Sequence, residues 1–74
     1  MEAKLFEIIN IVLSNNDLKT IDKINPTLSL QTDLEMDSII LAELTVRIED
    51  EFDVDVFENG MVHTVKDILD IIKS

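Results

Sequence analysis

Residues 33–52, DLEMDSIILAELTVRIEDEF, decide the fold of this 74-residue chain. Within them, apolar side chains recur at steps of three, four and four residues: Leu41, Leu44, Ile48 and Phe52. That period is typical of a helix that buries one face. Asp37 stands just before the pattern, where a carboxylate is a favoured helix N-cap. The stretch therefore predicts an amphipathic helix whose first residue is Ser38.

Two further segments carry the same helical period. The first has apolar residues at Leu5, Ile8, Ile9, Val12 and Leu13, and we expect it to end near residues 14–16. The last has apolar residues at Val65, Ile68, Leu69 and Ile72. Thr64 is the expected N-cap of this last helix.

A long connection, residues 15–36, separates the first two helices. Structureless loops of that length are uncommon in compact domains, so we expect its own apolar side chains to hold it on the core. These side chains are Leu18, Ile21, Ile24, Leu28, Leu30 and Leu34. A short helical turn is expected within residues 54–62, with Gly60 ending it. The expected fold is all-α, a small bundle of three longer helices and one short helix, in a single domain of residues 1–74.

The composition argues against several classes of protein. The chain has no cysteine, one glycine and one proline, so we expect no disulfide framework, no thiolate metal site and no tight-turn β architecture. The single histidine, His63, has no neighbouring ligand for a metal site, and no histidine stands near Ser38 in the sequence to form a catalytic pair. An enzyme is therefore not expected.

The sequence also bears on location. No apolar run approaches the ~20 residues of a membrane span, and residues 1–4 lack a secretory signal pattern. We expect a cytoplasmic protein that does not enter a membrane.

The charge of the chain is concentrated in one region. The net charge is -10, and residues 33–58 hold ten of the sixteen acidic side chains but only one basic side chain, Arg47. Such a surface repels the phosphates of nucleic acid and attracts a basic protein partner. A solvated acidic face that keeps the protein soluble is the plainer alternative.

Ser38 is the candidate functional residue. A helix N-terminus exposes unpaired N–H groups and a partial positive charge, so a phosphate ester on this hydroxyl would be well placed. Taken alone, an Asp-Ser pair at a helix start is ordinary capping chemistry. The acidic helix and the long preceding connection favour the functional interpretation.

The outward face of the same helix is expected to carry both aliphatic and acidic side chains. With the apolar stripe inward, a turn of ~100° per residue places Ile39, Glu43, Val46 and Asp50 on the opposite face. Two aliphatic side chains flanked by acids fit a surface that a basic partner docks on.

The segment Asp37-Ser38-Ile39, with the acidic helix that follows it, resembles the modification site of the acyl carrier protein family, and the resemblance covers most of the chain. It implies that Ser38 carries a covalent 4'-phosphopantetheine arm, which a separate phosphopantetheinyl transferase transfers from coenzyme A. The thiol of that arm would hold acyl groups as thioesters, which explains how a chain without cysteine could serve thiol chemistry as a carrier.

The resemblance also implies a monomer that docks on the transferase and on acyl-processing enzymes with basic surfaces. The expected docking residues are Asp37, Ile39, Ile40, Glu43, Val46 and Asp50. Glu35 stands where the family usually has glycine, and Ile39 where it usually has leucine. These departures leave fatty acid, polyketide and aminoacyl biosynthesis all open as the pathway. The alternative function is an acidic helical adaptor that binds a basic partner without being modified.

Overall fold

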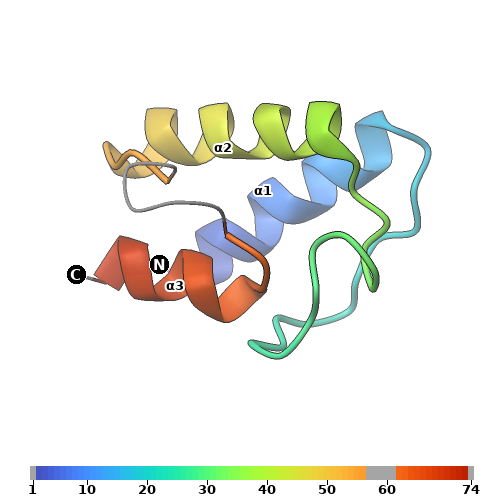
Figure 1. The fold of residues 1–74 in the computed structure, drawn as a ribbon, viewed down its shortest axis with the longest axis horizontal. Coiled ribbons are helices and arrows are strands. Elements are labelled where there is room, and N and C mark those ends of the chain that lie inside the picture. The colour runs from blue at the N-terminus through green and yellow to red at the C-terminus, as the bar shows by residue number, and fades with distance from the viewer. Residues whose placement is uncertain (1, 57–61, 74) are drawn as a thin grey trace.

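The computed structural model describes residues 2–56 and 62–73, and within them it is all-α (Figure 1). Helix α1 spans Glu2–Asn15, α2 spans Ser38–Phe52 and α3 spans Val65–Lys73. Helix α2 lies along one side of the molecule and α3 along the other, and the connection wraps around the end where α2 begins. The prediction of three helices is confirmed, including the start of α2 at Ser38.

The expected fourth helix is not seen. Residues 54–56 and 62 are not helical, and the rest of the segment, including Gly60, lies outside the described residues. The one β-type contact in the described ranges is an isolated antiparallel bridge between Ser29 and Thr64. No helix in these ranges is long and apolar enough to cross a membrane.

The core is almost entirely aliphatic. Its buried members are Leu5, Ile8, Ile9, Val12, Leu13, Leu30, Leu34, Met36, Leu41, Leu44, Ile48, Val56, Val62, Val65, Ile68, Leu69 and Ile72. Phe52, expected in the core, is half-buried and packs against it. Thr45 is buried as well, and its hydroxyl donates a hydrogen bond to the Ala42 carbonyl at 2.9 Å, so burial leaves it satisfied.

The connection between α1 and α2 packs onto the core as predicted. Leu30 and Leu34 are buried, and the other four apolar residues expected to hold it are partly buried against the core: Leu18, Ile21, Ile24 and Leu28. A side chain of α1 also binds its backbone. The Asn10 amide donates to the Ile21 carbonyl at 3.0 Å and accepts from the Ile21 N–H at 2.8 Å. This pair of bonds holds the first part of the connection, around Ile21, against α1.

The second part of the connection, residues 26–30, is hydrogen-bonded to the start of α3. The Leu30 N–H donates to the His63 carbonyl at 2.9 Å, and the Val65 N–H donates to the Leu28 carbonyl at 3.1 Å. A third bond runs from the Lys66 N–H to the Pro26 carbonyl at 3.0 Å. The connection therefore links all three helices, and several of its backbone polar groups are paired without regular secondary structure.

Helix α3 begins with reciprocal capping bonds. The Thr64 hydroxyl accepts from the Asp67 N–H at 3.2 Å, which confirms Thr64 as the N-cap. The Asp67 carboxylate accepts in return from the N–H groups of Thr64 at 3.1 Å and His63 at 2.9 Å. The bonds from His63 and then Thr64 hold the pKa of the Asp67 carboxyl below its ordinary value of 3.8.

We predict that Asp67→Ala lowers the free energy of unfolding by about 1 kcal/mol near neutral pH, because two backbone donors lose their acceptor. Since the folded-state pKa of Asp67 is depressed, its contribution is present above the ordinary pKa and is lost as the pH falls through the folded-state value. Urea denaturation of both proteins from pH 7 to pH 3 should show their difference shrinking below about pH 4.

The matched control for this prediction is Asp70→Ala. Asp70 lies on the same helix, and its carboxylate contacts the exposed Lys66 ammonium at 2.7 Å. Exposed i,i+4 pairs contribute little to stability, so this variant should lose less than Asp67→Ala. Equal losses in the two variants would contradict the capping role of Asp67.

Candidate functional site

Ser38 is exposed at the first residue of α2, and Asp37 is the N-cap that places it there. Asp37 has extended backbone angles (φ -84, ψ -177). Its carboxylate accepts from the Ile40 N–H at 2.9 Å, and its carbonyl accepts from the Leu41 N–H at 2.9 Å. The predicted N-cap is thus confirmed, and α2 begins one residue later.

The surroundings of the Ser38 hydroxyl suit attachment of a phosphate. The N–H groups of Ser38 and Ile39 have no intrahelical acceptor, and they lie at the partially positive end of the helix. Ser38 is an exposed residue, and among the described residues no side-chain hydrogen bond involves its hydroxyl. The residues present therefore fit a phosphate ester at this position.

The hydrogen bonding around Ser38 also bears on the reactivity of its hydroxyl. A serine hydroxyl becomes a good nucleophile when a neighbouring base accepts its proton. Within the described part of the chain, no base is hydrogen-bonded to Ser38.

The segment leading into Ser38 is fixed by burial and by backbone conformation. Met36 is only 2% exposed, and its N–H donates to the Leu30 carbonyl at 3.0 Å. Glu35, just before it, has a positive φ of 58°. A side chain with a Cβ is disfavoured in this left-handed conformation, which glycine adopts readily. The glutamate itself is visible in the sequence, but its backbone angle was not predicted from it.

The outward face of α2 carries the expected exposed aliphatic side chains. Ile39 is 78% exposed and Val46 is 62% exposed, which confirms their predicted orientation. Asp50 is exposed between neighbouring acids of the same helix. Ile40 differs from these residues, because it is partly buried and packs against the core. Of the two isoleucines that follow the serine, Ile39 is therefore the more available to a partner.

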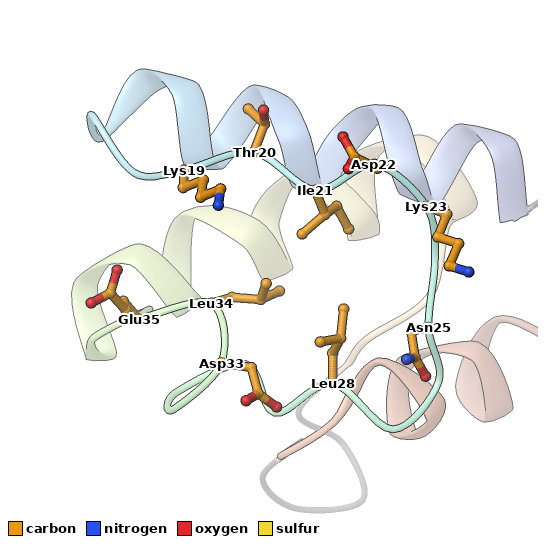
Figure 2. Close-up of a pocket in the computed structure, with 10 residues that line it drawn as sticks. All are labelled: Lys19, Thr20, Ile21, Asp22, Lys23, Asn25, Leu28, Asp33, Leu34 and Glu35. Atoms are coloured by element: carbon orange, nitrogen blue, oxygen red, sulfur yellow. The ribbon is translucent and has the colours of Figure 1, made fainter.

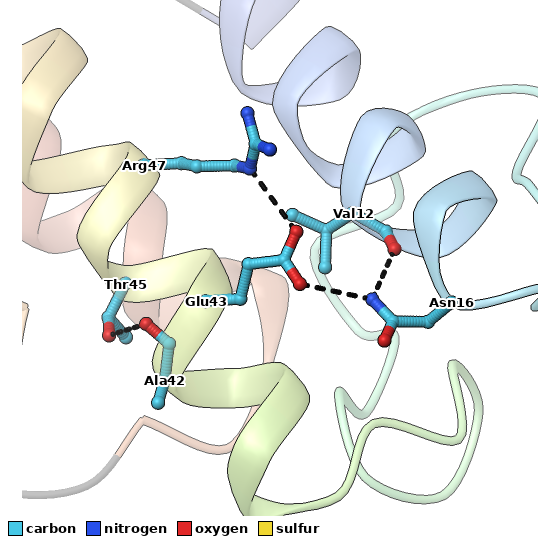
Figure 3. Close-up of polar contacts among 6 residues, drawn as sticks. All are labelled: Val12, Asn16, Ala42, Glu43, Thr45 and Arg47. Atoms are coloured by element: carbon cyan, nitrogen blue, oxygen red, sulfur yellow. Dashed lines mark hydrogen bonds and ion pairs between the residues drawn. The ribbon is translucent and has the colours of Figure 1, made fainter.

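Glu43 is partly shielded because it binds two neighbours (Figure 3). Its carboxylate accepts from the Asn16 amide at 3.2 Å and from the Arg47 Nε at 3.3 Å. The same Asn16 amide donates to the Val12 carbonyl at 2.8 Å, in the last turn of α1. The hydrogen bond from Asn16, with smaller contributions from Arg47, lowers the pKa of the Glu43 carboxyl. Glu43 thus joins the outer face of α2 to the end of α1.

Asn16 and Arg47 were not predicted from the sequence as partners of Glu43. The spacing of Arg47, four residues after Glu43 on one helix, is a signal that indicates this ion pair. Asn16 carried no such signal, because its contact depends on how α1 and α2 pack. In the described ranges, no group of three or more metal-ligating side chains comes together.

Comparison with known proteins gives one family match. Residues 7–72 match the family described as "Phosphopantetheine attachment site". The matched region contains all of α2 and the connection that precedes it. No solved structure shows a significant match to the chain.

We predict that Glu35→Gly is more stable than Glu35→Ala, because only glycine relieves the left-handed strain at this position. Both substitutions remove the same charge, so the comparison isolates the backbone effect. The expected difference in the free energy of unfolding is about 1 kcal/mol in favour of the glycine variant. Chemical denaturation at neutral pH measures it. A more stable alanine variant would show that the φ at Glu35 is not a constraint.

Proposed function

The chain belongs to the phosphopantetheine attachment family of carrier proteins, and we propose that Ser38 is the residue that bears the group. A carrier of this family bears a covalent 4'-phosphopantetheine, which a phosphopantetheinyl transferase attaches, and presents it to processing enzymes. The family is not catalytic. The observation that supports Ser38 is its accessible, unbonded hydroxyl at the first residue of α2, inside the matched region.

The other described serines are less suitable. Ser14 lies at the C-terminal end of α1, where the partial negative charge of the helix disfavours a phosphate. The Ser29 hydroxyl accepts from the Thr32 N–H at 3.2 Å, and its residue is partly buried by the bridge to Thr64. Ser38 is the only one of the three that combines exposure with a helix N-terminus.

The attachment step uses the Ser38 oxygen as the nucleophile. A bond forms between Oγ and the phosphorus next to the pantetheine of coenzyme A, and the bond from that phosphorus to the leaving phosphate breaks, releasing adenosine 3',5'-bisphosphate. The hydroxyl proton passes to a base of the transferase, because the described chain bonds none to Ser38. Once attached, the group supplies a thiol that can hold an acyl group as a thioester. The chain itself has no cysteine for this purpose.

Within this family, we assign the chain the role of a monomeric acyl carrier domain spanning residues 1–74. Its cargo would be an acyl or aminoacyl intermediate of fatty acid, polyketide or aminoacyl biosynthesis. Recognition would run along the outer face of α2, where Ile39 and Val46 fill apolar pockets and Asp50 meets basic side chains. An unmodified acidic adaptor is the outcome that the following experiment would reveal instead.

We predict that incubation with coenzyme A and a phosphopantetheinyl transferase raises the intact mass by one phosphopantetheine, and that Ser38→Ala abolishes this increase. The fold should persist, because the hydroxyl makes no contact with the core. Ser14→Ala and Ser29→Ala are the controls and should be modified as completely as the wild type. A wild-type mass that stays unchanged would favour the adaptor, and a modified Ser38→Ala protein would place the group elsewhere.

We predict that Asp50→Lys lowers the rate of this modification about fivefold at low ionic strength, as expected when one attractive charge contact of up to about 1 kcal/mol is lost. The effect should fade as salt screens the surface. Asp50 is a sharper choice than Glu43, because Glu43→Lys would also break the bond to Asn16.

The control for the docking prediction is Glu2→Lys, which changes the net charge equally but lies on α1 and not on the outer face of α2. Its only ion pair, among the described residues, is a 3.9 Å contact with Lys73. Equal slowing by the two substitutions would mean that net charge, and not the outer face of α2, controls the encounter.

A further inference from the structure

The connection between α1 and α2 contains a cavity that the site described above does not use. It lies between two segments of the connection, residues 19–25 and 28–35, and has a volume of about 390 Å³ (Figure 2). Pockets that bind small ligands in proteins begin at about 300 Å³. The cavity is therefore large enough for a small organic group, although it is widely open to solvent.

The lining of this cavity is amphipathic. Ile21, Leu28 and Leu34 point toward its centre from three sides and form an apolar floor (Figure 2). Lys19, Lys23 and Asn25 stand around them with donors, and three carboxylates stand there as acceptors. The Asn25 side-chain oxygen is already used, since it accepts from the Thr27 N–H at 3.1 Å and from the Thr27 hydroxyl at 2.8 Å. Its amide nitrogen is left to face a ligand.

The cavity lies within reach of Ser38. Glu35, which lines it, precedes the serine by three residues, and three residues of chain span at most about 11 Å. A phosphopantetheine arm has as many chain atoms as about five residues and extends to about 17 Å. The connection and the start of α2 occupy the same end of the molecule (Figure 1). The arm is thus long enough to fold back into the cavity.

We propose that this cavity binds the pantetheine part of the arm carried by Ser38 and holds it against the connection between encounters with partner enzymes. The inference rests on the proposed attachment at Ser38. Pantetheine combines a branched dimethyl carbon, a hydroxyl and two amides, which match an apolar floor ringed by both hydrogen-bond donors and acceptors. An alkyl tail fits less well, because burying it would desolvate the charged rim formed by Lys19, Lys23 and their acidic neighbours.

The first test compares the amide spectra of the unmodified and modified protein, labelled with nitrogen-15. Docking is expected to shift the amide signals of Ile21, Lys23 and Leu28, which are far from Ser38 in the sequence. Shifts confined to the first turn of α2, or found instead on α2 and α3, would overturn the proposal. The mass of the same sample separates the two hypotheses. A modified chain without shifts at the cavity rejects docking alone, whereas an unmodified chain rejects the attachment and docking with it.

The second test measures how fast iodoacetamide alkylates the thiol of the modified protein. Only the undocked arm reacts freely, so the rate reports the undocked fraction. If about three quarters of the arms are docked, Leu28→Ala and Lys23→Glu should raise the rate up to about fourfold. Lys23→Glu changes an exposed rim residue, so it tests the proposal even if the Leu28 variant fails to fold.

The control for the alkylation test is Lys73→Glu, which changes the net charge equally on α3 and should leave the rate unchanged. Equal rates in the wild type and in both cavity variants would overturn the proposal. An increase in all three variants would overturn it as well, since it would reflect the charge of the chain and not the cavity.

Discussion

Burial of side chains from the connection between α1 and α2 is the constraint on which the rest of the structure depends. Leu30, Leu34 and Met36 come from this non-helical segment, yet they are as buried as the inward residues of the helices. A domain of 74 residues buries a modest share of its surface, so each buried side chain contributes a large part of its stability. Truncating a buried Leu or Met costs about 2–5 kcal/mol, against a total stability of about 5–15 kcal/mol for typical domains. Since Met36 precedes Ser38 by two residues, the same burial that closes the core also fixes where the serine lies.

Two electrostatic effects of different range meet at the start of α2. The partial positive charge of the helix end acts within about one turn. It therefore favours a phosphate on Ser38 but has little effect on groups farther along the helix. The acidic side chains along α2 act together over about a Debye length, roughly 8–10 Å in physiological salt, and attract basic surfaces from outside. A chain with a net charge of -10 can therefore hold an anionic group at one point and still attract cationic partners to the surface beside it.

Much of this architecture follows from local sequence. The bounds of α2, its cap at Asp37 and the exposure of Ile39 and Val46 all depend on helical period and capping, which act within a few residues. The contacts that sequence reasoning missed join distant segments: Asn10 with Ile21, Asn16 with Glu43, and Leu30 with His63. Polar side chains such as asparagine give no periodic signal, and their partners become definable only when the helices are packed. The positive φ of Glu35 was missed for a related reason, because the closed connection imposes a conformation that glutamate itself disfavours.

The hydrogen bonds between the connection and the start of α3 have a consequence for cooperative opening. The amide protons of Leu30, Val65 and Lys66 are all protected by bonds across this one junction, so a single local unfolding event would expose them to hydrogen exchange together. Leu30 also belongs to the approach to α2, because its carbonyl accepts from the Met36 N–H. Detachment of α3 would therefore loosen the segment that presents Ser38. The presentation of the serine depends on a helix that contributes none of the residues assigned to the site.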